Sequence, residues 1–269
     1  MAYEGDIARG LDRAAASAQR GVLDLETAKC VILSDQHKGK RDGADDFLRC
    51  EAGYHAALGY YLEAGYQLWA LGDVEELWEC KPADVLRAYP RTMALEAEFH
   101  AQGRYRRFFG NHDDEWMEES AVRRWLGPVF GAIEVLESLV LTVRKQGRDL
   151  GTLVLVHGHQ GTKSSDKNRK FSRWVVRTFW RPIQRLTGAK LSTPATSFAL
   201  REKHDRAMHL WAAGQSGVVL VAGHTHRPVF MPEPGSGPLE ARLAELRRAG
   251  RSADSALARA ELEWLRVME

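Results

Sequence analysis

The sequence predicts an α/β fold built on a mainly parallel sheet, and three observations support this prediction. The chain has 269 residues, of which 44% are hydrophobic and 28% are charged, a composition that suits a globular protein with one large core. Five short apolar runs end in polar or glycine-rich tips, as buried strands do when they lead into loops. Amphipathic helical stretches separate the first runs, and this alternation favours a parallel sheet covered by helices.

The predicted elements can be placed along the chain. Helices are expected within residues 44–64 and 90–102, where apolar residues recur three and four positions apart. A strand at Val135–Val143 and a turn near Gln146-Gly147 are expected to form a hairpin with the run from Thr152. The apolar runs, written with their polar tips, are CVILSDQH from Cys30, YQLWALGD from Tyr66, YRRFFGNHD from Tyr105, TLVLVHGH from Thr152 and VVLVAGHTH from Val218.

Charge and cysteine content narrow the class of protein. The formal net charge of +2 excludes a polyanion as the partner of the whole molecule, so no specific nucleic acid partner is expected. The three cysteines are odd in number and lack C-x-x-C spacing, which predicts reduced thiols in a reducing compartment. The start of the chain lacks a secretory h-region, and no run approaches the roughly 20 apolar residues of a spanning helix. We therefore expect a cytoplasmic protein, at most peripheral at a membrane.

The polar tips together offer a set of metal-competent and proton-competent side chains. Taken alone, each has an ordinary explanation, such as a helix cap for Asp73 or a turn for Asn111. The carboxyl ends of parallel strands converge on one sheet edge, where open α/β folds bind ligands. An ordered set on five successive tips therefore predicts one site. Its candidate members are Asp35, His37, Asp73, Asn111, His112, His157, His224 and His226.

This ligand set predicts a metal centre. Mixed oxygen and nitrogen ligands suit Mn²⁺, Fe²⁺ or Zn²⁺ better than Mg²⁺ or Ca²⁺ alone. The set exceeds the need of one ion, but two ions about 3.5 to 4 Å apart that share a carboxylate would use it. Two divalent ions outweigh the charges of Asp35 and Asp73, so the site would attract phosphate oxygens and acidify a bridging water. These are the requirements for hydrolysing a phosphate ester.

The motifs D-x-H, G-D, G-N-H-D, G-H and G-H-x-H, in this order over roughly residues 27–230, resemble the calcineurin-like metallophosphoesterase superfamily. The resemblance implies a four-layer α/β/β/α sandwich with a dinuclear centre at the sheet edge. It also implies Mn²⁺ as the leading metal, with Fe or Zn as alternatives, and attack on phosphorus by metal-bound hydroxide. One ion would take Asp35, His37 and His226, the other would take Asn111, His157 and His224, and Asp73 would bridge them.

His112 is not a metal ligand in this scheme. It would stabilise the charge of the transition state or protonate the leaving oxygen, tasks that suit a histidine near neutral pH. In the protein-phosphatase branch a carboxylate three residues after the bridging Asp orients such a histidine, and Glu76 occupies that position here. His159 lies beyond the matched motif and is expected to be a loop residue.

Three local features are similar to the UDP-2,3-diacylglucosamine pyrophosphatase group of this superfamily: GDVEELW from Gly72, HTHRP ending at Pro228, and a basic aromatic insertion. That group cleaves a pyrophosphate in a lipid A precursor and covers the acyl chains with its insertion. Two positions depart from it. His112 stands where the group has Arg, which favours ordinary phosphomonoesterase or phosphodiesterase chemistry, and His159 stands where the group has Asp.

The insertion is expected at about residues 160–214, within a domain at 27–235 that is flanked by helical segments at 1–26 and 236–269. From Lys163 to Arg206 there are twelve Lys or Arg against three acidic residues. One interpretation is a packed helix with a solvated basic face; the other is a cap that holds an anionic, partly apolar substrate and touches a membrane surface. The substrate-binding residues predicted for the cap are Lys163, Lys167, Arg169, Arg173, Trp174 and Arg177.

Several functions stay open at this stage. The leading substrate is an amphiphilic or nucleotide-sugar lipid phosphate, and the alternative is a general phosphomonoesterase or phosphodiesterase acting on phosphoproteins or nucleotides. A catalytically silent protein-binding scaffold on the same fold is disfavoured because all seven implied metal ligands are present. A metallo-β-lactamase-like hydrolase would need H-x-H-x-D-H, which the sequence lacks. The oligomeric state is left open.

Overall fold

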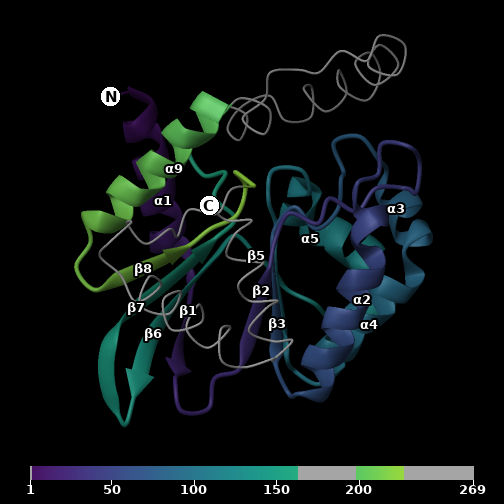
Figure 1. Ribbon diagram of the computed structural model, residues 1–269, viewed down its shortest axis with the longest axis horizontal. Coiled ribbons are helices and arrows are strands. Elements are labelled where there is room, and N and C mark those ends of the chain that lie inside the picture. Colours follow the sequence, from purple (N-terminus) through teal and green to yellow (C-terminus); the bar gives the residue numbers. More distant parts are fainter. Residues whose placement is uncertain (1, 163–197, 227–269) are drawn as a thin grey trace, which may run out of the picture. The chain divides into compact units, whose positions relative to one another are not determined.

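Two four-stranded sheets organise the protein, in a computed structural model that describes residues 2–162 and 198–226 (Figure 1). These residues belong to one compact unit, Met1–His226, and residues 227–269 lie outside the described residues. The first sheet has the order β1 (Gln19–Asp24), β6 (Ser138–Lys145), β7 (Arg148–Val156) and β8 (Val218–Val221). The second has the order β2 (Cys30–Leu33), β3 (Gln67–Leu71), β4 (Tyr105–Phe108) and β5 (Val135–Leu136).

The second sheet is parallel throughout, as the alternation of strands and helices predicts. Helices α2 (Phe47–Glu63), α3 (Pro82–Ala88) and α4 (Pro90–Ala101) occupy the crossovers. Leu58 of α2, Leu68 of β3 and Phe99 of α4 form one fully buried cluster, which fixes these helices on the sheet. After β4 the chain forms short turns of helix: η1 (Asp114–Met117), α5 (Glu119–Ala121), η2 (Val122–Leu126) and α6 (Gly127–Phe130).

The first sheet is mixed, because β6 runs antiparallel to β7 whereas its other pairs are parallel. Helices α1 (Ala2–Ser17) and α9 (Phe198–Ala213) lie side by side over this sheet (Figure 1). Ile7 and Leu11 of α1 share a core cluster with Trp211 of α9 and Val154 of β7. Residues 1–26, expected to be helical, thus also supply β1. Helix α9 falls inside the range expected for a cap, yet its apolar face is part of the core.

The run Val135–Val143 is not one strand, contrary to the sequence prediction. Val135 and Leu136 pair with β4 in the second sheet, and from Ser138 onward the chain pairs with β1 and β7 in the first. Both pieces are apolar because both are largely buried, so hydrophobicity alone gives no sign that the pairing partner changes at Glu137. The hairpin prediction is confirmed: Gln146 and Gly147 both have positive φ, 50° and 72°, as a tight hairpin turn requires.

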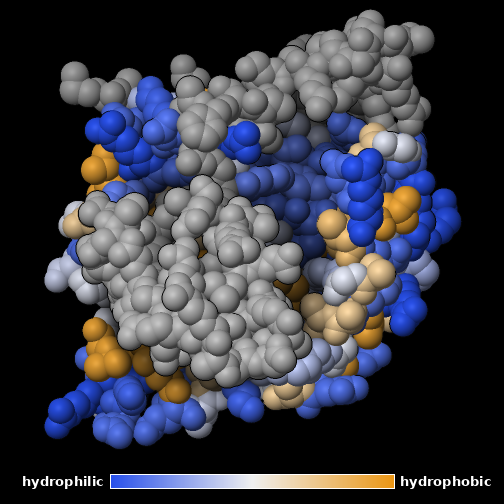
Figure 2. Space-filling view, viewed as in Figure 1, coloured by the Kyte–Doolittle hydropathy of each residue, from blue (hydrophilic) through white to orange (hydrophobic). Residues whose placement is uncertain are grey.

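The sheets also contact each other. Trp69 and Phe108 of the second sheet share a buried cluster with Leu139 and Leu155 of the first. The four-layer order that the resemblance implies stays a prediction. Hydrophilic residues gather around a hollow in the upper part of the face seen in Figure 1 (Figure 2). Within the described residues, no helix combines the length and apolarity needed to cross a membrane, and all three cysteines are free thiols.

Candidate metal centre

The structure brings the predicted residues together where strands of both sheets end. In the second sheet, Asp35 and His37 follow β2, Asp73 follows β3, and Asn111 with His112 follows β4. In the first sheet, His157 follows β7, and His224 with His226 follows β8. The sequence predicted convergence on the edge of one sheet. The structure instead uses the carboxyl edges of two sheets, which the core cluster between them holds next to each other.

The Asp73 side chain contacts residues from three different loops. Its side chain is 2% exposed, and Oδ2 lies 3.1 Å from His157 Nε2 and 3.7 Å from His37 Nε2. Oδ1 accepts a hydrogen bond of 2.7 Å from the backbone N–H of His112. A single carboxylate therefore reaches the ends of β2, β4 and β7, which is the position required of a bridging ligand.

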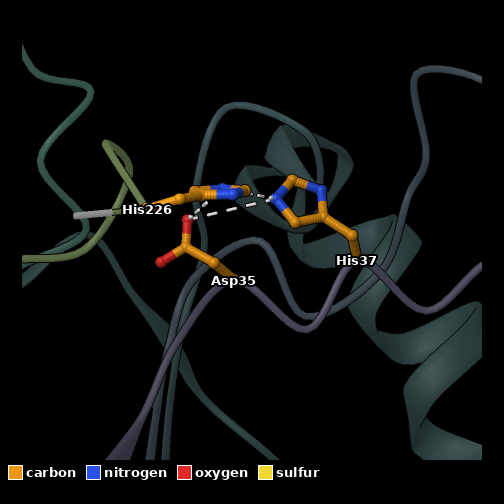
Figure 3. A group of neighbouring side chains, drawn as sticks. All are labelled: Asp35, His37 and His226. Atoms are coloured by element: carbon orange, nitrogen blue, oxygen red, sulfur yellow. Dashed lines mark hydrogen bonds and ion pairs between the residues drawn. The ribbon is translucent and has the colours of Figure 1, made fainter. Parts of the chain in front are cut away.

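Asp35, His37 and His226 form a first group of converging ligand atoms (Figure 3). Nε2 of His226 lies 3.2 Å from Asp35 Oδ1 and 3.2 Å from Nε2 of His37. Figure 3 shows the two rings turned toward each other above the Asp35 carboxylate. The backbone N–H of His224 donates to both oxygens of that carboxylate, at 3.0 and 3.1 Å. Ser34 Oγ donates to Oδ2 at 2.5 Å, so the carboxylate is held from several sides.

Asp73, His157 and His224 form a second group, whose ligand atoms lie within 4.8 Å of one another. Nδ1 of His157 lies 2.9 Å from the backbone carbonyl of Leu71 and donates to it. This hydrogen bond fixes the tautomer that leaves Nε2 as an electron-pair donor toward the site, the arrangement seen for metal-binding histidines. His157 is fully buried, so its ring has little freedom to turn.

Three polar atoms of the predicted metal ligands are buried without hydrogen-bond partners, and this allows a test of whether a cation fits the site. They are His224 Nε2, Asn111 Oδ1 and His157 Nε2, the last touching Asp73 without hydrogen-bond geometry. Leaving such an atom unsatisfied costs about 1–3 kcal/mol. With the histidines neutral, all three atoms present lone pairs, and ligand atoms of His157 and His224 lie within 4.8 Å of each other, close enough to share one cation. They are also the three ligands that the resemblance implies for one ion, so the donor set fits a metal.

The charges of the site favour a cation as well. Burial opposes ionisation of Asp35, but the contacts with His226 and His157 lower its pKa to about 2. Burial holds the pKa of His224 well below its ordinary value. His224 is therefore neutral at physiological pH, as a metal-binding imidazole must be. Ionised carboxylates beside a neutral imidazole make a site that attracts positive ions.

The backbone of the site is strained at the predicted ligands. Of the seven non-glycine residues with positive φ in the described ranges, five are candidate ligands. Left-handed backbone costs about 1 kcal/mol or more at each such residue and gathers at functional sites. These five residues are Asp35 at 58°, His37 at 47°, Asp73 at 50°, His224 at 75° and His226 at 53°. The loops thus keep an unfavourable backbone conformation at these five residues, and this conformation directs their side chains into the candidate site.

Two glycines allow the loops to approach one another. A Cβ atom on Gly110 would overlap Oδ1 of Asp73, and one on Gly223 would overlap the carboxylate of Asp35 and Oγ of Ser34. The glycines of G-N-H-D and G-H-x-H are therefore needed for space. A side chain at either position would displace a carboxylate that belongs to the candidate site.

His112 lies beside the ligand groups, in contact with Glu76. Oε2 of Glu76 lies 2.7 Å from His112 Nδ1 and 3.1 Å from His37 Nδ1, so one oxygen accepts from both rings. Trp78 stacks on His112, with 4.6 Å between ring centroids and 19° between planes. Burial works against protonation, but the carboxylates of Glu76 and Asp73 raise the pKa of His112 to about 10. His112 is therefore protonated at neutral pH.

Sequence reasoning missed several supporting contacts. Asp113, the last residue of G-N-H-D, accepts hydrogen bonds from the backbone N–H groups of Asp73, Val74 and Gly110. It thereby joins the loops after β3 and β4. Its position in the G-N-H-D motif was the one feature of the sequence that could have indicated this role.

His204 of α9 is a second missed contact. Its Nε2 lies 2.7 Å from the carbonyl of Gly158, and its Nδ1 lies 2.8 Å from the hydroxyl of Tyr3. No sequence motif indicates the contacts of His204 with Gly158 and Tyr3. His159, expected in a loop, is buried beside His157, with 5.5 Å between ring centroids. The predicted substrate-binding residues, Lys163 to Arg177, lie outside the described residues.

Comparison with known proteins adds little to this geometry. No model of a protein family and no curated protein sequence matches the chain. A solved structure, a dimetal phosphatase from Danio rerio, is similar at 13% sequence identity and a TM-score of 0.32, over 71% of this chain and 68% of that chain. A similarity at this level does not carry an argument about function, which therefore depends on the side chains of the site.

Proposed function

We propose that the chain is a dinuclear metal-dependent hydrolase of phosphate esters. The observation that carries the proposal is the pair of ligand groups around Asp73: Asp35, His37 and His226 on one side, His157 and His224 on the other. The orphaned Asn111 Oδ1 completes the second group. When bound there, divalent ions supply positive charge to phosphate oxygens and lower the pKa of water. Mn²⁺ is the metal that we propose first, with Fe or Zn as alternatives.

The residues beside the ligands give the reaction its proton donor. Against the effect of burial, the carboxylate of Glu76 raises the pKa of His112 and so favours its protonated form. The side chain of His112 is 28% exposed, whereas that of Asp73 is 2% exposed. Nδ1 of His112 is occupied by Glu76, so the proton on Nε2 is the one available to the oxygen that leaves phosphorus. Glu76 keeps the ring in this orientation, and stacking on Trp78 restricts its rotation. We infer that His112 is the general acid and Glu76 its positioning residue.

For the substrate we propose an amphiphilic phosphate, such as a nucleotide-sugar lipid related to UDP-2,3-diacylglucosamine. The support is the basic, aromatic composition of the segment after His157, which suits an anionic headgroup with apolar chains or a membrane surface. The competing proposal is a phosphomonoesterase or phosphodiesterase of soluble substrates, favoured by His112 in place of the Arg of the lipid-directed group. Both proposals use the same metal centre and differ in the cap.

A substrate panel at one Mn²⁺ concentration tests both the proposed hydrolase activity and the proposed class of substrate. It contains phosphomonoesters, bis-aryl diesters, cyclic nucleotides and UDP-diacylglucosamine, and Asp73→Ala is the inactive control. Turnover of any member that requires Asp73 supports the hydrolase. A protein that binds two ions but turns over none would support the silent scaffold instead.

The cap is tested by a deletion limited to residues 163–197. A wider deletion would remove α9, whose Met208 and Trp211 belong to the core. If the segment binds lipid, the deletion should impair the lipid-linked substrate far more than p-nitrophenyl phosphate. Equal losses on both substrates would contradict the cap.

A further inference from the structure

Four fully buried charges form a closed ring directly behind the candidate site. Nζ of Lys38 lies 3.3 Å from Glu75 Oε1 and 2.7 Å from Glu96 Oε1. The guanidinium of Arg107 contacts Oε2 of Glu75 through Nη2 and lies 3.5 Å from Oε2 of Glu96 through Nη1. All four side chains are 0% exposed. Each cation touches both carboxylates, and the charges of the ring cancel.

Neutral donors surround the two carboxylates. Glu96 accepts from the hydroxyls of Tyr54 at 3.1 Å and Tyr105 at 2.9 Å. Glu75 accepts from the indole N–H of Trp116 at 2.9 Å. A connected buried network of this kind is rigid, because moving one member leaves charged partners unsatisfied in a medium of low dielectric constant.

The ring is linked to the site through the backbone. Beyond the ends of β2 and β3 the two chains stay paired: the N–H of His37 donates to the carbonyl of Asp73 at 2.9 Å, and that of Lys38 to the carbonyl of Val74 at 3.0 Å. The N–H of Glu76 returns to the carbonyl of Lys38 at 3.0 Å. Lys38 and Glu75 are bridge partners in this short parallel ladder.

Side chains in such a ladder alternate between two directions. Lys38 and Glu75 point into the ring, whereas their neighbours His37 and Glu76 meet each other on the site side, Nδ1 to Oε2, at 3.1 Å. The first contact joins the bridge partners of this ladder, and the second crosses it diagonally between their neighbours. A displacement of Lys38 or Glu75 therefore moves a candidate metal ligand and the carboxylate that orients His112.

Stability alone does not explain the ring. A buried ion network gains little or nothing over well-packed apolar side chains of the same volume, because desolvation offsets the attraction between the charges. Lys38 already borders apolar surroundings, with Nζ 3.7 Å from the sulfur of Met93. An apolar core at this place would be as stable, but it would not fix the directions of the Lys38, Glu75, His37 and Glu76 side chains.

We propose that Lys38, Glu75, Glu96 and Arg107 are positioning residues: their ring sets the conformation of the paired loops so that His37 and Glu76 are preorganised for the metal centre. The proposal rests on the proposed function in one respect, namely that His37 is a metal ligand. The ordering of the paired loops does not depend on that assignment, so it can be measured on protein without metal.

The test removes one edge of the ring without leaving a net charge, by the double substitution Lys38→Met with Glu96→Gln. Leu11→Ala, which truncates a buried α1 side chain in a core cluster that contains no ring residue, controls for a general loss of stability. Amide hydrogen exchange of Lys38 and Glu76 is followed in the metal-free protein. Binding of Mn²⁺ is followed by calorimetry.

In the double variant, exchange at both amides is expected to accelerate by at least about tenfold. Mn²⁺ affinity is expected to fall by about 10- to 100-fold, the usual effect of losing supports behind metal ligands. Leu11→Ala should change each quantity by less than about twofold, once its loss of global stability has been taken into account. If the double variant fails to fold, Glu96→Gln alone should shift both quantities in the same direction.

Unchanged exchange at both amides in a folded ring variant would overturn the proposal, and so would equal changes in Leu11→Ala. A third outcome is faster exchange in the ring variant while the parent protein itself does not bind Mn²⁺. This outcome would support the role of the ring in ordering the loops and would refute the metal centre. The two proposals therefore fail in distinguishable ways.

Discussion

Replacing His112 by alanine separates the metal ligands from the proton donor. The two roles have to be distinguished because His37, Glu76 and His112 also place ligand atoms close enough together to hold an ion, which would make His112 a ligand. The structure favours the role of donor, since Nδ1 of His112 is 2.7 Å from Glu76 and the side chain is 28% exposed. Asp73 and His157, in contrast, are 2% and 0% exposed. We predict that His112→Ala retains two ions per chain.

The expected loss of rate follows from the chemistry of the leaving group. A positioned general acid contributes about 10²- to 10⁴-fold, which corresponds to about 3 to 5 kcal/mol of the barrier. The full loss is expected for an alkyl phosphate, whose alkoxide leaves poorly without a proton. It should be much smaller for p-nitrophenyl phosphate, because nitrophenolate is stable as the anion. The ratio of the two losses therefore measures proton donation.

The assay combines metal analysis by mass spectrometry with kcat for both substrates at saturating Mn²⁺. Asp73→Ala serves as the matched control, and it should lose metal and activity together. Glu76→Gln should retain part of the rate, because the amide oxygen still accepts from a ring nitrogen but carries no charge. Finding fewer than two ions in His112→Ala would make His112 a ligand, and equal losses on both substrates would refute its role as an acid.

Three further outcomes follow from single contacts. Gly110→Ala should fold, as judged by circular dichroism, yet bind Mn²⁺ at least about 10-fold more weakly, because the new methyl group displaces Asp73; parent-like affinity would show that the loop yields. Arg107→Met should lower the free energy of unfolding in urea by about 3–5 kcal/mol, because it leaves buried carboxylates underpaired; a loss below about 1 kcal/mol would contradict a tight ring. Burial opposes ionisation of Glu75, but Arg107 and Lys38 lower its pKa. Its contribution to stability is therefore present above about pH 4.3 and lost as the pH falls through the lowered pKa. Unfolding curves at pH 7 and pH 3 should thus differ more in the parent than in Glu75→Gln.

Much of the site was predictable because its residues occupy short motifs at strand ends. The position of Asp35 or His157 needs only an apolar run and the polar tip that follows it. The pairing of the strands was not predictable in the same way. Val135 and Leu136 are as apolar as the residues of β6, so the sequence carried no sign that the chain leaves one sheet for the other at Glu137.

The ring behind the site was not predictable for a different reason. Lys38 and Glu75 are charged residues in polar loops, where single-sequence reasoning expects exposure to solvent. Their burial arises only when Glu96 from α4 and Arg107 from β4 arrive with opposite charges. The relevant information is thus spread over four distant positions, and no local pattern records it.

The positions of these charges explain how the loops that carry His37 and Asp73 can keep a strained backbone conformation. His37 and Asp73 have φ values of 47° and 50°, and a loop without support would relax from them. Lys38 is one residue after His37, and Glu75 is two residues after Asp73. Each contacts two buried opposite charges, and Glu75 also accepts a hydrogen bond from the Trp116 indole. Releasing the strain would require pulling a charge out of the ring. Anchoring a residue close to a strained candidate ligand, instead of the candidate ligand itself, leaves the lone pairs of that side chain available to a metal ion.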